Sequence, residues 1–87
     1  MADHKETFPL VVNGENTTVE INVNEPLRNL VKAGLKETDN EKGHALEDWE
    51  VRAVTGGPVL DQSKKIEDYH FAAGTKLYVD LKVGGGG

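Results

Sequence analysis

The sequence predicts an α+β fold in which one helix packs across one face of a mixed sheet of four to five strands. Alternating apolar and polar residues favour strands near both ends of the chain, at 8–12, 17–23 and 76–82. A single stretch between them, 27–35, carries apolar residues at helical spacing. The length of 87 residues supports one compact core and not two.

The first two strands are expected to form an antiparallel hairpin. Their inward residues are Phe8, Leu10 and Val12, followed by Val19, Ile21 and Val23. Asn13-Gly14 lies between the strands and favours the positive φ angles of a tight hairpin turn. Pro9 cannot donate a ladder hydrogen bond, so it belongs at the start of its strand or in an unpaired register.

The helix is expected to start at Asn24-Glu25-Pro26, with Asn24 or Glu25 as the cap and Pro26 in the first turn. Its apolar stripe consists of Leu27, Leu30, Val31 and Leu35. Gly34 weakens the helix relative to alanine, which indicates close packing against the sheet. Residues 38–48 are polar and are expected to form an exposed loop.

The second half of the chain supplies the remaining strands. Trp49, Val51 and Ala53 are the expected inward residues of a third strand, and Val59-Leu60 reads as a very short strand after the Gly56-Gly57-Pro58 turn. Residues 61–71 are expected to cross irregularly, partly as helix, to the last strand. That strand directs Leu77, Val79 and Leu81 inward and Tyr78, Asp80 and Lys82 outward.

Composition excludes several classes of function. The net charge of −5 and the scattered basic residues argue against nucleic-acid binding. No apolar run is long enough to span a membrane and no signal peptide is apparent, so a cytoplasmic protein without membrane association is expected. The chain has no cysteine, so any thioester chemistry must use a partner's thiol.

The chain divides into a flexible N-terminal segment at 1–7, a folded domain at 8–82 and a flexible tail at 83–87. The tail contains Gly84, Gly85, Gly86 and Gly87. Glycine has no Cβ, so such a run fits a narrow enzyme tunnel and leaves its terminal carboxylate open to adenylation, thioester formation and isopeptide formation. A flexible linker or a remnant of cloning is the other interpretation of the tail.

Side chains with catalytic potential do not form an enzyme-like pattern, and neither a catalytic residue nor a bound cofactor is expected. His4, His44 and His70 lack the close spacing of a metal site. Ser63 has no nucleophile-elbow context, and the acidic residues Asp61, Glu67 and Asp68 read as solvated loop carboxylates. The surface favoured for recognition is the outward set Arg52, Val54, Tyr78 and Asp80, against the alternative of ordinary exposed strand residues.

The order of elements and two segments resemble ubiquitin, which has the β-grasp fold. The segments are Lys65-Ile66-Glu67-Asp68-Tyr69-His70-Phe71 and Leu77-Tyr78-Val79-Asp80-Leu81-Lys82, followed by the diglycine end. From about Val51 to Gly86 the two sequences align without a gap. The most specific element is Asp68-Tyr69, whose tyrosine hydroxyl in ubiquitin ties down the crossing loop. The resemblance therefore implies a structural role for Tyr69.

A narrower resemblance is to bacterial ubiquitin-like proteins. It rests on 24–31 (NEPLRNLV), on Glu47-Asp48-Trp49 and on the glycine end. Those proteins are encoded beside ubiquitin-type activating enzymes, conjugating enzymes and metal-dependent isopeptidases. The resemblance implies a monomeric modifier that an activating enzyme adenylates with ATP and Mg²⁺, transfers to a cysteine and conjugates to target proteins.

Departures from ubiquitin fall where its partners bind. Val54 aligns with the isoleucine of ubiquitin's apolar patch, but Asp80 replaces a valine and Tyr78 a histidine. Burying an unpaired Asp80 against an apolar partner costs several kcal/mol, so ordinary ubiquitin receptors are expected to bind poorly. Lys82 keeps a positive charge where ubiquitin has an arginine near its tail, but Gly84 replaces the next arginine of ubiquitin. Recognition by a dedicated activating enzyme is therefore expected, and not recognition by the enzyme that activates ubiquitin.

Two other functions remain compatible with the same residues. One is a sulfur carrier, in which the terminal carboxylate becomes a thiocarboxylate. The other is a noncovalent ubiquitin-like interaction module that forms part of a larger protein, with the glycines belonging to a linker.

Overall fold

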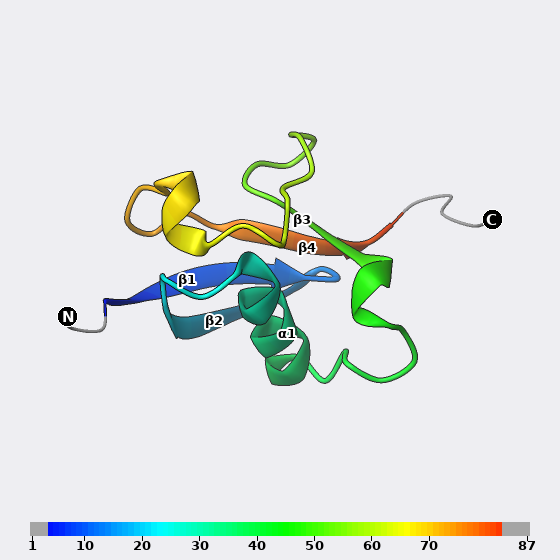
Figure 1. Cartoon of the computed structure of the whole chain (residues 1–87). Helices are drawn as coiled ribbons and strands as arrows, with labels where there is room; N and C mark the ends of the chain where they lie inside the picture. The colour runs from blue at the N-terminus through cyan, green and yellow to red at the C-terminus, as the bar shows by residue number, and fades with distance from the viewer. Residues whose placement is uncertain (1–3, 83–87) are drawn as a thin grey trace.

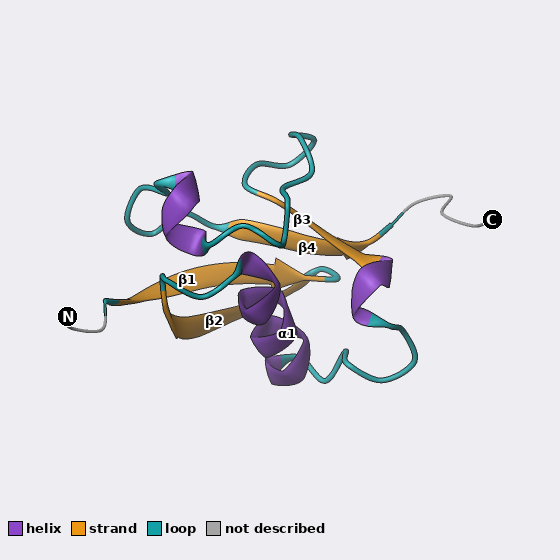
Figure 2. Cartoon of the chain, viewed as in Figure 1, coloured by secondary structure: helices purple, strands orange, loops and turns teal. Residues whose placement is uncertain are grey.

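The computed structural model describes residues 4–82, which form a four-stranded mixed sheet with one α-helix against it (Figures 1 and 2). The strands are β1 (Lys5–Val12), β2 (Glu15–Asn22), β3 (Trp49–Arg52) and β4 (Leu77–Leu81). The helix α1 is Leu27–Glu37, and the short 3₁₀ helices are η1 (Leu46–Asp48) and η2 (Ile66–Tyr69). The predicted α+β architecture is confirmed.

The strand order is β2-β1-β4-β3, so the first and last strands lie side by side at the centre of the sheet. β1 pairs antiparallel with β2, and Asn13 (φ 50°) and Gly14 (φ 84°) form the predicted turn. β4 runs parallel to β1, with Leu10 opposite Leu77, and antiparallel to β3, with Trp49 opposite Leu81. The parallel central pair is made possible by the long crossing from α1 to β4.

The core lies between α1 and one face of the sheet. The predicted inward residues of β1 and β2 and the predicted stripe of α1 are all buried. Gly34 is the point of closest approach, because a Cβ at this position would lie 2.6 Å from Leu10 Cδ1 and 3.3 Å from Val12 Cγ2. The expectation that Gly34 marks close packing of the helix on the sheet is therefore confirmed.

Several boundaries differ from the sequence prediction. Residues 5–7, expected in a flexible segment, belong to β1, because β2 continues to Asn22 and supplies ladder partners as far as Lys5. Residues 59–60 are not a strand, although the Leu60 N–H donates to the Val51 carbonyl over 2.8 Å. Ala53 follows the end of β3, and both it and Leu81 are only partly buried.

The start of α1 also differs. Pro26 is the N-cap and not a residue of the first turn, and no side chain caps the helix, so the expected cap at Asn24 or Glu25 is wrong. Carbonyl groups of the crossing segment replace the side-chain cap. The N–H groups of Leu27 and Arg28 donate to Lys64 O and Gln62 O over 2.8 and 2.9 Å.

The crossing segment, residues 61–71, is held by Tyr69 of η2. The Tyr69 hydroxyl accepts a hydrogen bond from the Asp61 N–H at 2.6 Å and donates one to the Asp61 carbonyl at 2.9 Å. The tyrosine therefore has the structural role that the resemblance implies. Among residues 4–82, no helix has the length and apolar character needed to cross a membrane.

Candidate recognition site

The outward residues of β3 and β4 are neighbours on the sheet face opposite α1. The strand register places Arg52 opposite Tyr78 and Glu50 opposite Asp80. Val11 of β1 lies opposite Tyr78 on the other side of β4. Side chains alternate along a strand, so these residues share one face, and the structure brings three of the predicted recognition residues together.

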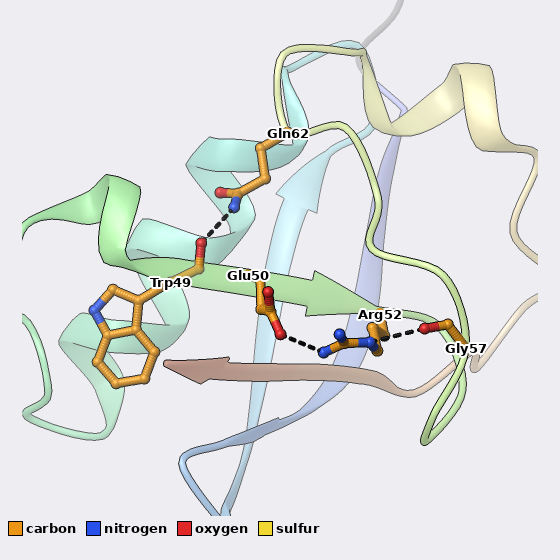
Figure 3. Close-up of polar contacts among 5 residues, drawn as sticks. All are labelled: Trp49, Glu50, Arg52, Gly57 and Gln62. Carbon is orange, nitrogen blue, oxygen red and sulfur yellow. Dashed lines mark hydrogen bonds and ion pairs between the residues drawn. The ribbon is translucent and has the colours of Figure 1, made fainter. Parts of the chain in front are cut away.

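Arg52 is held in place by two contacts (Figure 3). Its Nη1 donates to Glu50 Oε2 at 2.6 Å, and its Nε donates to the Gly57 carbonyl at 2.8 Å. Both side chains of the ion pair are largely shielded, with exposures of 28% for Arg52 and 13% for Glu50. Arg52 therefore acts as a neutralised, rigid part of the surface that ties the turn after β3 to the sheet.

Val54 projects from the turn that Arg52 holds. Its exposed fraction is 59%, and the nearby Val59 is 50% exposed. The Gly57 N–H donates to the Val54 carbonyl at 3.0 Å, and a Cβ at Gly57 would overlap the Val54 side chain. The turn thus presents Val54 to solvent, and Val59, two residues after Gly57, is a second exposed valine. The sequence pattern does not identify Val59 as an exposed surface residue, because it predicts a strand at Val59-Leu60.

Asp80 is exposed, whereas Tyr78 and Val11 are half-buried. Asp80 lies opposite Glu50, whose carboxylate is already paired with Arg52. Like charges directly opposite on neighbouring strands repel, so the surface has a local excess of negative charge beside an apolar centre. A partner that buries this face must supply a donor or a cation to Asp80.

Lys82 follows β4 and is exposed. Its backbone N–H donates to the Asp48 carbonyl at 2.9 Å, which fixes the direction in which the chain leaves the sheet. The predicted conjugation tail, Gly84 to Gly87, lies outside the described residues. Lys82 is therefore the last predicted recognition residue that the structure places.

The histidines do not form a metal site in residues 4–82, where no group of three or more His, Cys, Asp or Glu side chains has suitable geometry. His4 and His70 line one hollow of about 400 Å³ at the start of β1, although they are distant in sequence. His4 Nε2 lies 2.9 Å from Glu6 Oε2. His44 instead packs edge-on against Trp49, with the ring centroids 6.0 Å apart.

Ser63 serves the local backbone. Its hydroxyl and N–H both donate to Asp61 Oδ1, at 2.7 and 2.9 Å. These hydrogen bonds, with the hydroxyl first, lower the pKa of Asp61 below its ordinary value, and the nearby Lys64 charge adds to the effect. The predictions that Ser63 and Asp61 are surface loop residues fit this geometry.

A sequence profile of the family described as "Protein of Unknown function (DUF2604)" matches residues 2–87. A curated relative, "Uncharacterized protein y4jI" of Sinorhizobium fredii (strain NBRC 101917 / NGR234), is 41% identical over 75 residues, which are 86% of this chain and 56% of the relative. The chain therefore spans a little over half of that relative's length.

Solved structures with the same arrangement of elements are ubiquitin-like. The UBL domain of Plasmodium falciparum Dsk2 has a TM-score of 0.70 at 18% identity, covering 91% of this chain and 100% of that one. Caldiarchaeum subterraneum ubiquitin has a TM-score of 0.71 at 14% identity, covering 95% of this chain and 100% of that one. The fold is thus the ubiquitin-like β-grasp that the sequence predicts.

Proposed function

We propose that this chain, which belongs to the family described as "Protein of Unknown function (DUF2604)", is a protein modifier that is activated at its C-terminal glycine carboxylate. The observation that carries the proposal is the direct junction of a ubiquitin-like domain with a glycine run. β4 ends at Leu81, and the four consecutive glycines begin at Gly84. Nothing in the packing of β4 requires four glycines at that place.

The chemistry is an adenylation of the terminal carboxylate followed by three transfers of its acyl group, first to a thiol of the activating enzyme, then to a thiol of the conjugating enzyme and last to an amine. The terminal carboxylate attacks the α-phosphate of Mg²⁺-bound ATP on an activating enzyme, forms an acyl adenylate and releases pyrophosphate. A thiolate of the enzyme then attacks the acyl carbon and AMP leaves. After transfer to a conjugating enzyme, an amine of the target protein displaces the thiolate and forms an isopeptide bond. This chain supplies the acyl group and no thiol, since it contains no cysteine.

Partners are expected to bind the outward face, made of Arg52, Val54, Tyr78 and Asp80, together with Lys82 beside the tail. Support comes from the exposure of Val54 and from the rigidity that the Arg52 contacts give to the turn. A preorganised surface loses little conformational entropy on binding. The partners in this proposal are a ubiquitin-type activating enzyme, a conjugating enzyme, a metal-dependent isopeptidase and target proteins, all in a bacterial cytoplasm.

A noncovalent interaction module is the second candidate. The observation in its favour is that the chain spans only 56% of its curated relative, so a domain of this kind also occurs within a longer chain. In a module of that type the glycines connect folded units and their carboxylate is never free. The two candidates differ in one measurable property, the reactivity of the tail.

The test is to incubate the chain with a candidate ubiquitin-type activating enzyme, ATP and Mg²⁺, and to analyse the products on a nonreducing gel and by intact mass. A modifier forms an adduct that a thiol reagent removes, and a matched chain lacking Gly86-Gly87 does not. Exchange of one oxygen for sulfur, after addition of a sulfur donor, identifies a sulfur carrier instead. An equal reaction of the shortened chain, or no adduct with a demonstrably active enzyme, overturns the proposal.

A further inference from the structure

The hollow of about 400 Å³ that His4 and His70 line lies where the start of β1 meets η2, away from the end of β4 (Figure 1). Its walls are joined by backbone hydrogen bonds through Val23. The Val23 N–H donates to the His4 carbonyl at 2.9 Å, and the Glu67 N–H donates to the Val23 carbonyl at 2.9 Å. The hollow is therefore bounded by segments that are fixed to one another, and its volume is in the range of about 300–1,000 Å³ that is typical of ligand pockets.

The inward face of β1 changes from apolar to polar at this hollow. The register places Phe8 opposite Val19 and Glu6 opposite Ile21, so Phe8 and Glu6 share the side of the sheet that carries α1. Phe8 is buried, whereas Glu6 is half-buried. The alternation of β1 would favour an apolar residue at position 6, and a partly buried carboxylate there calls for a partner.

The buried part of the lining is apolar and the exposed part is polar. Two phenylalanines, the buried Phe8 and the half-buried Phe71, line the hollow together with Val23 and Ile66. The polar lining consists of two glutamates and two histidines, namely Glu6, Glu67, His4 and His70. Among the described residues of the lining there is no lysine or arginine. With neutral histidines, the hollow therefore carries two negative charges beside aromatic rings.

The contacts of these two carboxylates within residues 4–82 are weak. Glu6 Oε2 lies 2.9 Å from Nε2 of His4, a side chain that is 70% exposed. Glu67 Oε2 lies 4.0 Å from Lys65 Nζ, and these two side chains are 47% and 59% exposed. Ion pairs between exposed side chains contribute little free energy. An ionised carboxylate can accept about four hydrogen bonds, so both glutamates keep free acceptors.

We propose that this hollow binds an arginine side chain of a partner protein. A guanidinium group has five donors and a permanent charge, which suits two carboxylates that lack strong donors. It is also weakly hydrated and stacks on aromatic rings, while its methylene stem packs on apolar surface. These properties match a lining in which Phe8 and Phe71 lie beside the glutamates.

Binding in this hollow does not depend on the chemistry of the tail. The hollow lies on the α1 side of the sheet at the start of β1, whereas the candidate recognition face lies opposite α1 and β4 finishes at the other end. A modifier attached through its carboxylate and a noncovalent module would both present the hollow to a partner. The hollow is thus a second binding site, separate from the outward residues of β3 and β4.

The first experiment titrates the full chain with the peptide acetyl-Gly-Arg-Gly-amide and follows the ring C–H signals of the three histidines by NMR. His44 packs against Trp49 outside the hollow and is the internal control. The arginine peptide is expected to shift the His4 and His70 signals and not that of His44. The matched peptide with citrulline, which has nearly the same shape and no charge, should shift none. Equal shifts with citrulline, or a shift of His44 alone, overturn the site.

A peptide with lysine in place of arginine tests the choice of cation. The lysine peptide is expected to bind more weakly, because an ammonium group is strongly hydrated and has no planar face to place on an aromatic ring. Equal affinity for the two peptides overturns the assignment to arginine.

Variants assign the binding to the two carboxylates. Glu6→Gln and Glu67→Gln are each expected to weaken binding of the arginine peptide about two- to fivefold, the range for an exposed ion pair. Glu20→Gln is the matched control, because Glu20 is an exposed carboxylate on the other face of the sheet. Unchanged affinity in both hollow variants, or an equal loss in Glu20→Gln, contradicts the site. Circular dichroism of every variant checks that the fold is retained.

The pH dependence of binding provides an independent readout. Histidine takes up a proton between about pH 8 and about pH 5, whereas arginine stays charged. Positive charges on His4 and His70, added to that of Lys65 beside Glu67, should weaken binding of the arginine peptide at about pH 6 relative to about pH 7.5. The combined variant His4→Gln and His70→Gln should lose this dependence. An undiminished dependence in that variant shows that the histidines do not face the bound arginine.

Residues 1–3 precede His4 and lie outside the described residues, so they are the alternative occupant of the hollow. The combined variant Met1→Gly, Ala2→Gly and Asp3→Gly removes their side chains. If this variant binds the arginine peptide much more tightly than the unaltered chain, the N-terminal residues fill the hollow and the assignment to a partner is wrong. Equal affinities support the partner.

Discussion

The Tyr69 hydroxyl group joins the two ends of the crossing segment, residues 61–71, by hydrogen bonds. It exchanges two hydrogen bonds with the backbone of Asp61, while its ring stacks on Phe71 at a centroid distance of 5.2 Å. Tyr69→Phe removes the hydrogen bonds and keeps the stacking. We expect a loss of about 1–2 kcal/mol in the free energy of unfolding, since a net hydrogen bond contributes about 0.5–1.5 kcal/mol.

Urea unfolding measures the change, and Tyr78→Phe is the matched control. The Tyr78 hydroxyl forms no hydrogen bond within residues 4–82, so its removal should change stability by less than about 0.5 kcal/mol. Hydrogen exchange at the Asp61 amide should accelerate in Tyr69→Phe alone. Equal stability losses in the two variants contradict the role given to Tyr69.

The ionisation of the Asp61 carboxyl makes the stability of the fold depend on pH. Its pKa lies below the ordinary value of 3.8, chiefly because the Ser63 hydroxyl and then the Ser63 N–H donate to the ionised carboxylate. A lowered folded-state pKa stabilises the fold above the unfolded-state pKa, and this contribution is lost as the pH falls through the folded-state pKa. The affected window therefore lies below about pH 4.

Ser63→Ala removes the largest cause and leaves the backbone donor. We expect the pKa of the Asp61 carboxyl to rise towards 3.8 without reaching it, as followed by NMR of the side-chain carbon against pH. Lys64→Gln should raise the same pKa by less, because the Lys64 charge is the smallest of the lowering causes. An unchanged pKa in Ser63→Ala shows that the hydroxyl contact is absent in solution.

At the scale of elements, the contact between α1 and β1 depends on Gly34. Alanine favours the helix by up to about 1 kcal/mol over glycine, but its Cβ would lie 2.6 Å from Leu10 Cδ1 in the packed core. Overpacking of a core costs about 1–3 kcal/mol. We expect Gly34→Ala to destabilise the fold by about 1 kcal/mol in chemical denaturation.

A double-mutant cycle identifies the cause. Leu10→Val removes the clashing methyl group, so the combined Gly34→Ala and Leu10→Val variant should be more stable than the sum of the single effects predicts. Lys32→Ala, at an exposed position of α1, should have little effect on stability. Strict additivity of the two core changes contradicts close packing as the reason for Gly34.

Elements with local signals were predictable from the sequence. The hairpin turn at Asn13-Gly14 and the stripe of α1 depend on neighbours within a few residues. Contacts between distant segments were not predictable in detail. The carbonyls of Gln62 and Lys64 cap the start of α1. The turn at Val54 is fixed by the hydrogen bond from Arg52 Nε to the Gly57 carbonyl. Such pairings exist only after the crossing has folded back on the sheet.

The candidate site was predictable to the same extent. Alternation along β3 and β4 is local, so it placed Arg52, Tyr78 and Asp80 on one face correctly. The pairing of Arg52 with Glu50 is a tertiary detail that turns an expected cation into a neutral, fixed group.

At the scale of the whole molecule, the parallel pairing of β1 and β4 separates the two ends of the domain. β1 begins at one end of the sheet and β4 finishes at the other, as Figure 1 shows. A protein bound at the end of β4 is therefore remote from the start of β1. In the proposed function, additions at the two termini have opposite consequences.

A fluorescent protein fused ahead of Met1 is expected to leave thioester formation unchanged, because it lies far from the end of β4. The same protein fused after Gly87 should abolish the reaction, since it converts the terminal carboxylate into an amide that ATP cannot adenylate. Both fusions should unfold in urea at the same concentration as the unfused domain. A protease that cuts directly after Gly87 and leaves no added residue there provides the control, because this cleavage regenerates the Gly87 carboxylate and should restore the adduct on a nonreducing gel. Failure of the cleaved chain to react, with the N-terminal fusion active, contradicts activation at Gly87.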